Sequence, residues 1–306
     1  MTKPVPVYFT SHAGVRLRID QMVAGSGHKY RLSEVDNQVE AVRTGGKDGL
    51  RHLVDVPSVT TLLNRVIAKP GLTNWARTEA IEGVDAALDK LSAAGQPFAI
   101  GSTGASLVEA HKRHLIYSAA KEIAEAKQQS RIDHGTGIHN AISSWALGEE
   151  AEGDNAIKYR GHVLAIQQWL ADNQYDISDA EGIAYNEADG YAGCFDLLLE
   201  HPTADGTRYA IADIKATNGV YPEMAFQLAA YASALYSMFG ISVDELLVLH
   251  FPSDPDAPPE ITEYAVDAWD SADLAASSNL VHDTGALLEA AQLMGGWAPF
   301  TKKEVA

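Results

Sequence analysis

The chain has 306 residues, of which 46% are hydrophobic, enough for a sizeable core in one large domain or two small ones. It lacks a run of about eighteen apolar residues and a leader-like N-terminus, so we expect a cytoplasmic protein that is neither secreted nor inserted in a membrane. The formal charge of −18 disfavours a polyanionic partner, and the single cysteine, Cys194, excludes an internal disulfide and a four-cysteine iron–sulfur cluster.

The charge is distributed unevenly along the chain. Residues 1–137 hold 17 Lys and Arg against 14 Asp and Glu, a net of +3, whereas residues 138–306 hold 6 against 27, a net of −21. We therefore expect a nucleic-acid contact surface to draw on the N-terminal half, although scattered solubilising charges would give the same count. The candidate contacts are Arg65, Lys69, Arg77, Lys112, Arg113, Lys121, Lys127 and Arg131.

The first half of the chain predicts strands and then helices. Short apolar runs broken by Gly and Asn predict irregular strands and turns up to about residue 56. Apolar residues at helical spacing predict helices over residues 61–67, 73–93 and 105–128. Gly135-Thr136-Gly137 is expected to open another helix, which carries His139 and ends near Gly148.

The second half predicts a mixture of strands and helices. Helix formers dominate residues 156–173, and β-branched residues then predict strands at 182–186, 191–199 and 209–215. The last two strands are expected to form a hairpin that turns at residues 201–207, where Pro202 and Gly206 lie. A helix over 222–239, a buried strand over 245–250 and a C-terminal helix over 266–294 complete the pattern.

Two aspartates and a lysine fall in the predicted hairpin. Asp196 lies within one apolar run, and Asp213-Ile214-Lys215 ends the next strand. Charged groups in such a setting are costly unless they are paired or bind a ligand. Lys215 follows Asp213 by two residues and so points to the same side of its strand. The pattern predicts a Mg²⁺ or Mn²⁺ site beside a lysine, with a structural ion pair between Asp213 and Lys215 as the alternative.

Four further side chains are candidates for the same site. His139 would be a ligand, or else a packed core histidine. Glu187 precedes Asp196 by nine residues and would add a carboxylate, or else be a solvated turn residue. Gln227 and Tyr231 are four apart on a predicted helix and share one face, where they would orient Lys215 or a phosphate oxygen, or simply pack.

These elements, in this order, resemble the PD-(D/E)XK nuclease superfamily, and within it the RecB-like branch, which includes the mitochondrial genome maintenance exonuclease and related phage exonucleases. The segment from Glu187 to Asp196 fits the Glu-then-Gly-x-x-Asp pattern of that branch, and Pro57-Ser58-Val59-Thr60 with Trp75 is similar to its entry segment. The likeness covers about residues 57–250. Ala216 follows the lysine where the family often has Thr or Ser.

The resemblance implies an α/β, restriction-endonuclease-like fold, with a mixed central sheet flanked by helices and an N-terminal β/helical extension. Three regions are implied: a strand-rich extension at residues 1–56, a nuclease domain with its helical DNA-gripping part at 57–250, and a C-terminal loop and helical extension at 251–306. The implied ligands of Mg²⁺ or Mn²⁺ are His139, Asp196, Asp213 and the carbonyl of Ile214. The implied catalytic set is Lys215, Asp213, Asp196, Glu187, Gln227 and Tyr231, and DNA contacts are implied for Ser58, Thr60, Lys69, Trp75, Lys112 and Arg113.

The expected function is therefore a Mg²⁺- or Mn²⁺-dependent deoxyribonuclease, an exonuclease that hydrolyses DNA from its ends in phage recombination, replication or repair. The expected partners are DNA ends or single strands, together with a recombination protein or a second copy of the chain. Two alternatives stay open. One is an endonuclease of the same fold, which would nick closed circles, and the other is a non-catalytic protein that binds DNA ends or mimics DNA.

Overall fold

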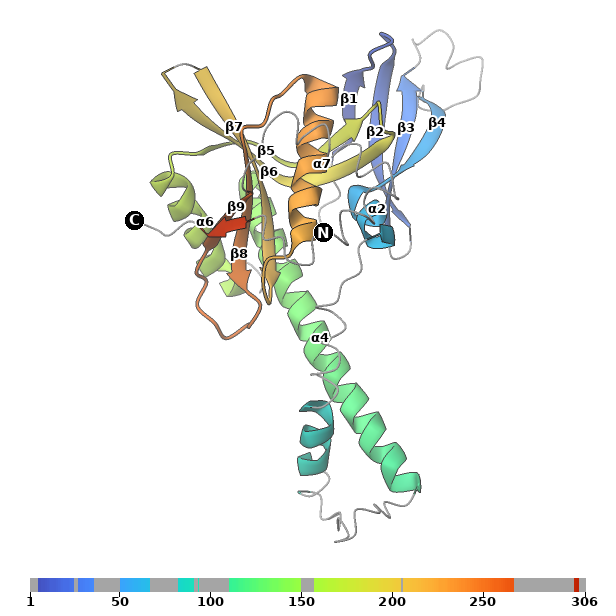
Figure 1. Ribbon diagram of the computed structural model, residues 1–306, viewed down its shortest axis with the longest axis vertical. Coiled ribbons are helices and arrows are strands. Elements are labelled where there is room, and N and C mark those ends of the chain that lie inside the picture. Colours follow the sequence, from blue (N-terminus) through green and yellow to red (C-terminus); the bar gives the residue numbers. More distant parts are fainter. Residues whose placement is uncertain are drawn as a thin grey trace. The chain divides into compact units, whose positions relative to one another are not determined.

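The computed structural model describes residues 5–24, 27–35, 50–66, 82–90, 93, 110–149, 157–204, 206–266 and 300–302 (Figure 1). The chain forms two compact units, one made of Met1–Ile67 with Gly135–Ala306 and the other of Ala68–His134. The regions expected to meet at residues 56 and 250 stay a prediction. The described part is an α/β protein with two sheets, as expected for the fold class.

The N-terminal strands form an antiparallel sheet of their own in the order β1-β2-β3-β4. Its strands are β1 (Val7–Thr10), β2 (Arg16–Ala24), β3 (Gly27–Val35) and β4 (Leu50–Pro57). Burial alternates along β2, where Leu17 and Ile19 are buried and Arg18 between them is only partly buried. This inner face shares a core with Ile183, Tyr185 and Ala192. The first strands are therefore packed against the second sheet.

The second, central sheet has six strands in the order β10-β9-β8-β7-β6-β5. They are β5 (Asp176–Asn186), β6 (Tyr191–Thr203), β7 (Gly206–Thr217), β8 (Glu245–Pro252), β9 (Thr262–Val266) and β10 (Phe300–Lys302). The hairpin of β6 and β7 is confirmed. Only β7 and β8 run parallel among the described strands, and α7 (Pro222–Phe239) connects them. The sheet is therefore mixed, and β9 and β10 extend it beyond the expected last strand.

Helices cover both faces of the central sheet. The described helices besides α7 include α2 (Val59–Val66), α4 (Ala110–Ala146) and α6 (Arg160–Asp172). Figure 1 shows α7 lying along the sheet, where Leu228 and Leu235 pack with Ile211 and Val248. On the other face, Ile142 of α4 and Ile166 of α6 pack with alternate residues of β7 and β8, among them Ala212 and Leu247. Two apolar clusters thus enclose the middle of the sheet.

One expectation about the helices is wrong. Residues 105–128 and the segment after Asp133 were expected to form separate helices, but α4 is continuous and Gly135 and Gly137 lie inside it. Glycine in a helix costs about 1 kcal/mol relative to alanine. Here glycine is needed for close packing, because a Cβ on Gly137 would lie 2.1 Å from the ring of Tyr159. Tertiary packing overrides the helix-breaking tendency of these glycines.

Several expectations fall outside the described residues. These are the C-terminal helix at 266–294, most of the helix at 73–93, and Lys69, Trp75 and Arg77. Arg65, Lys112 and Arg113 lie in helices whose side chains at those positions are not described. Within the described part of the chain, no helix combines the length and the apolar character needed to cross a membrane.

Candidate metal centre

The two aspartates lie where β6 and β7 separate. The antiparallel ladder runs from Thr203 opposite Gly206 to Leu197 opposite Ala212, and the next pair in this register would be Asp196 and Asp213. Beyond the ladder the backbone N–H of Ile214 donates to Asp196 Oδ2 at 2.7 Å instead of to a strand carbonyl. Both aspartates are buried, with exposures of 8% and 1%. The predicted convergence of two carboxylates from neighbouring strands is confirmed.

Lys215 and α7 hold Asp213 from two sides. Lys215 Nζ lies 2.5 Å from Asp213 Oδ2, as the two-residue spacing on one strand predicted. From α7, Gln227 Nε2 donates to the hydroxyl oxygen of Tyr231 at 2.9 Å and lies 3.5 Å from Asp213 Oδ1, at the outer limit of a hydrogen bond. The Gln227 and Tyr231 side chains share the face that the sequence predicted, and Gln227 faces Asp213.

His139 reaches the same cluster from α4. Its Nε2 lies 3.0 Å from Asp196 Oδ1 and 3.4 Å from Glu181 Oε1. The His139 side chain is 31% exposed, whereas the side chains of Asp196 and Glu181 are 11% and 13% exposed. The imidazole therefore lies between two largely buried carboxylates and is itself open to solvent.

Glu181, which the sequence analysis missed, stands where Glu187 was expected. The β5–β6 register places Glu181 between the pairs of Ala180 with Leu197 and Gly182 with Phe195, and thus beside Asp196. Glu187 lies at the turn after β5, where its carboxylate accepts a hydrogen bond from the backbone N–H of His12 at 2.9 Å. The expected placement of Glu187 in the cluster is therefore wrong. The predicted strand began at Gly182, one residue too late to include Glu181.

Charges in this cluster compete with burial. Burial raises the pKa of Asp213 to about 6, against the opposing effect of Lys215, and burial also raises the pKa of Glu181. For Asp196, burial is outweighed by the charge and hydrogen bond of His139 and by Lys215, so its pKa lies below the ordinary value. Asp196 in turn raises the pKa of His139 to about 9. Burial opposes the charge on Lys215, but Asp213 and Asp196 prevail and raise its pKa.

Comparison with known proteins assigns no family to the chain. No protein-family model matches the sequence, and a search of curated proteins finds no match.

The donor atoms at this corner suit a hard divalent cation. One ligand atom each from His139, Glu181 and Asp196 lie within 4.8 Å of one another. Mg²⁺ holds oxygen ligands at about 2.0–2.1 Å in an octahedron, which puts adjacent ligand atoms about 3 Å apart. The 3.0 and 3.4 Å separations from His139 Nε2 are close to that value. These three residues therefore fit Mg²⁺ or Mn²⁺, with carboxylate oxygens as the main donors, whereas the expected ligand Asp213 is not part of this group.

Gly193 allows Tyr231 to lie against β6. A Cβ at Gly193 would be 2.2 Å from Cε1 of Tyr231, far inside contact distance. Gly193 is the glycine of the Gly-x-x-Asp pattern that ends at Asp196, and Tyr231 ends the Gln-x-x-x-Tyr pattern. The two sequence patterns are thus linked by direct packing. Tyr231 is 3% exposed, and burial raises its pKa well above the ordinary value.

Ser58 and Thr60 lie at the start of α2. Ser58 Oγ accepts a hydrogen bond from the backbone N–H of Thr61 at 3.1 Å, so Ser58 caps this helix. Ser58 is 2% exposed and bridges to Ala192 of β6. Its hydroxyl is engaged inside the fold with Thr60 and Thr61, and the expected contact of Ser58 with DNA stays a prediction. Thr60 is partly buried beside it, with Oγ1 3.1 Å from Ser58 Oγ, and its contact with DNA stays a prediction.

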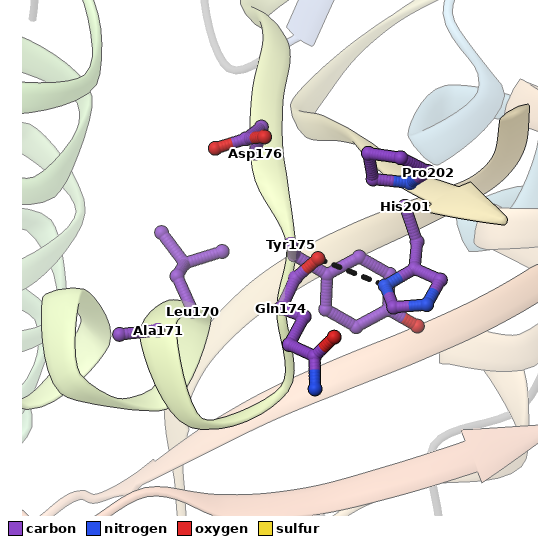
Figure 2. Close-up of a pocket in the computed structure, with 7 residues that line it drawn as sticks. All are labelled: Leu170, Ala171, Gln174, Tyr175, Asp176, His201 and Pro202. Atoms are coloured by element: carbon purple, nitrogen blue, oxygen red, sulfur yellow. Dashed lines mark hydrogen bonds between the residues drawn. The ribbon is translucent and has the colours of Figure 1, made fainter.

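An open hollow of about 400 Å³ lies elsewhere on the central sheet, at the junction of α6, β5 and the end of β6 (Figure 2). Figure 2 shows His201 pointing toward the turn between α6 and β5, where its Nδ1 lies 2.8 Å from the carbonyl oxygen of Gln174. The lining residues are Leu170, Ala171, Gln174, Tyr175, Asp176, His201 and Pro202. None of the predicted site residues is among them, so the hollow is separate from the cluster around Asp196 and Asp213.

Proposed function

We propose that this protein is a Mg²⁺- or Mn²⁺-dependent deoxyribonuclease with a restriction-endonuclease-like core. The observation that carries the proposal is the Lys215–Asp213 pair beside Asp196 and His139, at the point where β6 and β7 separate. A structural ion pair would need no second buried carboxylate and no histidine beside it. Groups of this kind in one buried corner are typical of a catalytic site.

Each residue of the cluster has a role in this proposal. His139, Asp196, Asp213 and the carbonyl of Ile214 would hold the ion, which when bound polarises the scissile phosphate and lowers the pKa of an attacking water. Lys215 would orient that water and stabilise negative charge on the phosphate. Gln227 would keep Asp213 in place through its side-chain amide.

We further propose that the enzyme is an exonuclease that acts on DNA ends. The acidic C-terminal half supplies the carboxylates, and the N-terminal half, with a net charge of +3, supplies most of the contacts to phosphate. A bound cation offsets part of the local negative charge. The net charge of −18 therefore does not exclude DNA as the substrate.

The test uses 5′- and 3′-labelled linear DNA, single- and double-stranded, and covalently closed circles, each with Mg²⁺, Mn²⁺ or EDTA. We expect metal-dependent cleavage of linear DNA, intact circles, and at least about a 100-fold loss of rate in Lys215→Ala and Asp213→Ala. Lys158→Ala is the matched control for Lys215→Ala. It also removes a lysine, but Lys158 is exposed and its ammonium lies over the Tyr159 ring instead of beside Asp213.

Four outcomes would contradict the proposal. Nicked circles would indicate an endonuclease of the same fold. Absence of metal-dependent cleavage, or equal rates in the parent and both site variants, would remove the nuclease assignment. DNA binding without cleavage would favour a non-catalytic DNA-end-binding protein.

A further inference from the structure

Glu181 is fixed in one orientation by its neighbours. The hydroxyl of Ser143 on α4 donates to Glu181 Oε1, and the thiol of Cys194 on β6 lies 3.7 Å from Oε2. Ser143 is 3% exposed and follows His139 by one helical turn, with its Oγ 3.5 Å from His139 Nδ1. Ser143 thus links Glu181 to the helix that carries His139.

The backbone of Glu181 is in an unfavourable conformation. Its φ is 52°, in the left-handed region that residues with a side chain rarely adopt. Such conformations persist where surrounding contacts impose them, and they concentrate at functional sites. Here the contacts that hold the side chain are Ser143, His139 and Cys194. They turn the carboxylate toward Asp196.

The carboxylate of Glu181 lies within reach of the same ion as its two neighbours. Glu181 Oε1 lies 3.4 Å from His139 Nε2, which in turn lies 3.0 Å from Asp196 Oδ1. One ligand atom from each of the three residues lies within 4.8 Å of the others. Adjacent ligand atoms around one Mg²⁺ are about 3 Å apart, so this spacing suits a single ion held by all three side chains.

We propose that Glu181 is a metal ligand of this centre and that Ser143 is the residue that positions it. The inference rests on the proposed function for the identity of the site, but it concerns binding of the ion and not cleavage. The resemblance assigns the ion to His139, Asp196, Asp213 and the Ile214 carbonyl. Glu181 adds a third carboxylate, which approaches from β5.

The experiment measures Mn²⁺ binding to the full chain without DNA, by titration calorimetry and by the loss of the free Mn²⁺ electron paramagnetic resonance signal. We expect Glu181→Gln and Ser143→Ala each to weaken Mn²⁺ binding by about 10-fold or more, since loss of a ligand or of its hydrogen-bond partner commonly costs 10- to 100-fold in affinity. Ser143→Thr, which keeps the hydroxyl, should retain binding. Glu187→Gln is the matched control, because Glu187 lies at the turn with His12.

The outcomes separate this inference from the proposed function. Mn²⁺ binding that is lost in Asp196→Asn but unchanged in both Glu181→Gln and Ser143→Ala would overturn the inference and leave the nuclease proposal standing. Mn²⁺ binding that depends on Glu181 in a protein that cleaves no DNA would support the inference and overturn the nuclease proposal. A parent protein that binds no Mn²⁺ would overturn both. Circular dichroism confirms folding, and if Glu181→Gln does not fold, Ser143→Ala carries the test.

Discussion

Replacing Gly193 by alanine should disturb the surroundings of Asp213 through Tyr231. The new Cβ would lie 2.2 Å from Tyr231 Cε1, whereas carbon atoms in contact are about 3.5–4.0 Å apart. The ring must therefore retreat by roughly 1.3 Å or more, and overpacking of this kind costs about 1–3 kcal/mol. Because Gln227 bonds to the Tyr231 hydroxyl and faces Asp213, the shift is transmitted to the site. A displacement near 1 Å can lower a catalytic rate by about 100-fold.

Urea unfolding of four proteins isolates this clash. The proteins are the parent, Gly193→Ala, Tyr231→Ala and the double variant. Tyr231→Ala alone should cost about 3–5 kcal/mol, as aromatic truncations in cores do. In that background Gly193→Ala should cost less than about 0.5 kcal/mol, since the ring is absent, so the double-mutant cycle gives a coupling of about 1–3 kcal/mol.

Gly135→Ala provides the matched control for the glycine substitution. A Cβ at Gly135 would lie 3.7 Å from Cβ of Ala216, an ordinary contact, and alanine favours the α4 helix. This variant should be as stable as the parent or more stable by up to about 1 kcal/mol. Additive costs in the cycle, or a Gly193→Ala protein with parental stability and cleavage rate, would refute the packing link between β6 and α7.

Four further predictions concern the helices, binding of Mn²⁺ and the stability of the metal-free protein. Gly137→Ala should destabilise the protein by about 1–3 kcal/mol in urea, because its Cβ would overlap the Tyr159 ring; stability equal to that of Gly135→Ala would contradict this. Ser58→Ala should cost about 1 kcal/mol of unfolding free energy through loss of the α2 cap, and an unchanged urea midpoint would show that the cap contributes nothing. Mn²⁺ affinity should rise from pH 6 to pH 9 in calorimetry, because the ion displaces protons held by Asp213, whose pKa is about 6, and by His139, whose pKa is about 9. In the metal-free protein, the contribution of His139 to the free energy of unfolding should instead fall with rising pH. It is fully present below about pH 6.5 and is lost as the pH rises through about 9, the pKa of His139 in the folded protein. A stability difference between the metal-free parent and His139→Asn that grows with pH would contradict this.

Local spacing explains why part of the site could be predicted from sequence. Asp213 and Lys215 share a face because a strand repeats every two residues, and Gln227 and Tyr231 share one because a helix turn brings residues four apart together. Both relations depend only on the element type. The structure confirms both, through the Asp213–Lys215 contact and the Gln227–Tyr231 hydrogen bond.

Glu181 could not be found in this way because its role depends on contacts distant in sequence. The first half of β5, Asp-Ile-Ser-Asp-Ala-Glu-Gly, is polar and lacks the alternation typical of a strand. The left-handed φ of Glu181 interrupts that alternation further. The partners that place its carboxylate are Ser143 on α4 and Asp196 on β6. The pairing register of β5 with β6 would have revealed Glu181, because that register places Glu181 opposite Asp196.

The continuity of α4 was missed for a related reason. Glycine discourages helix locally, and only the packing of Gly137 against Tyr159 shows why the helix nevertheless continues. Tyr159 lies 22 residues further along the chain, beyond the reach of a local pattern. Close backbone approach is visible in the fold and not in residue propensities.

The parallel pairing of β7 with β8 has a consequence for synthesis of the protein. During translation, β7 emerges with Asp213 and Lys215 but stays an unpaired sheet edge on one side until α7 and then β8 have left the ribosome. A chain that ends before residue 245 would lack β8. It would leave the edge of β7 exposed beside Asp213 and Lys215, and would be prone to pair with other chains. The nascent protein should therefore complete the sheet beside Asp213 and Lys215 and gain protection against pairing with other chains at the same moment, when residues 245–252 dock.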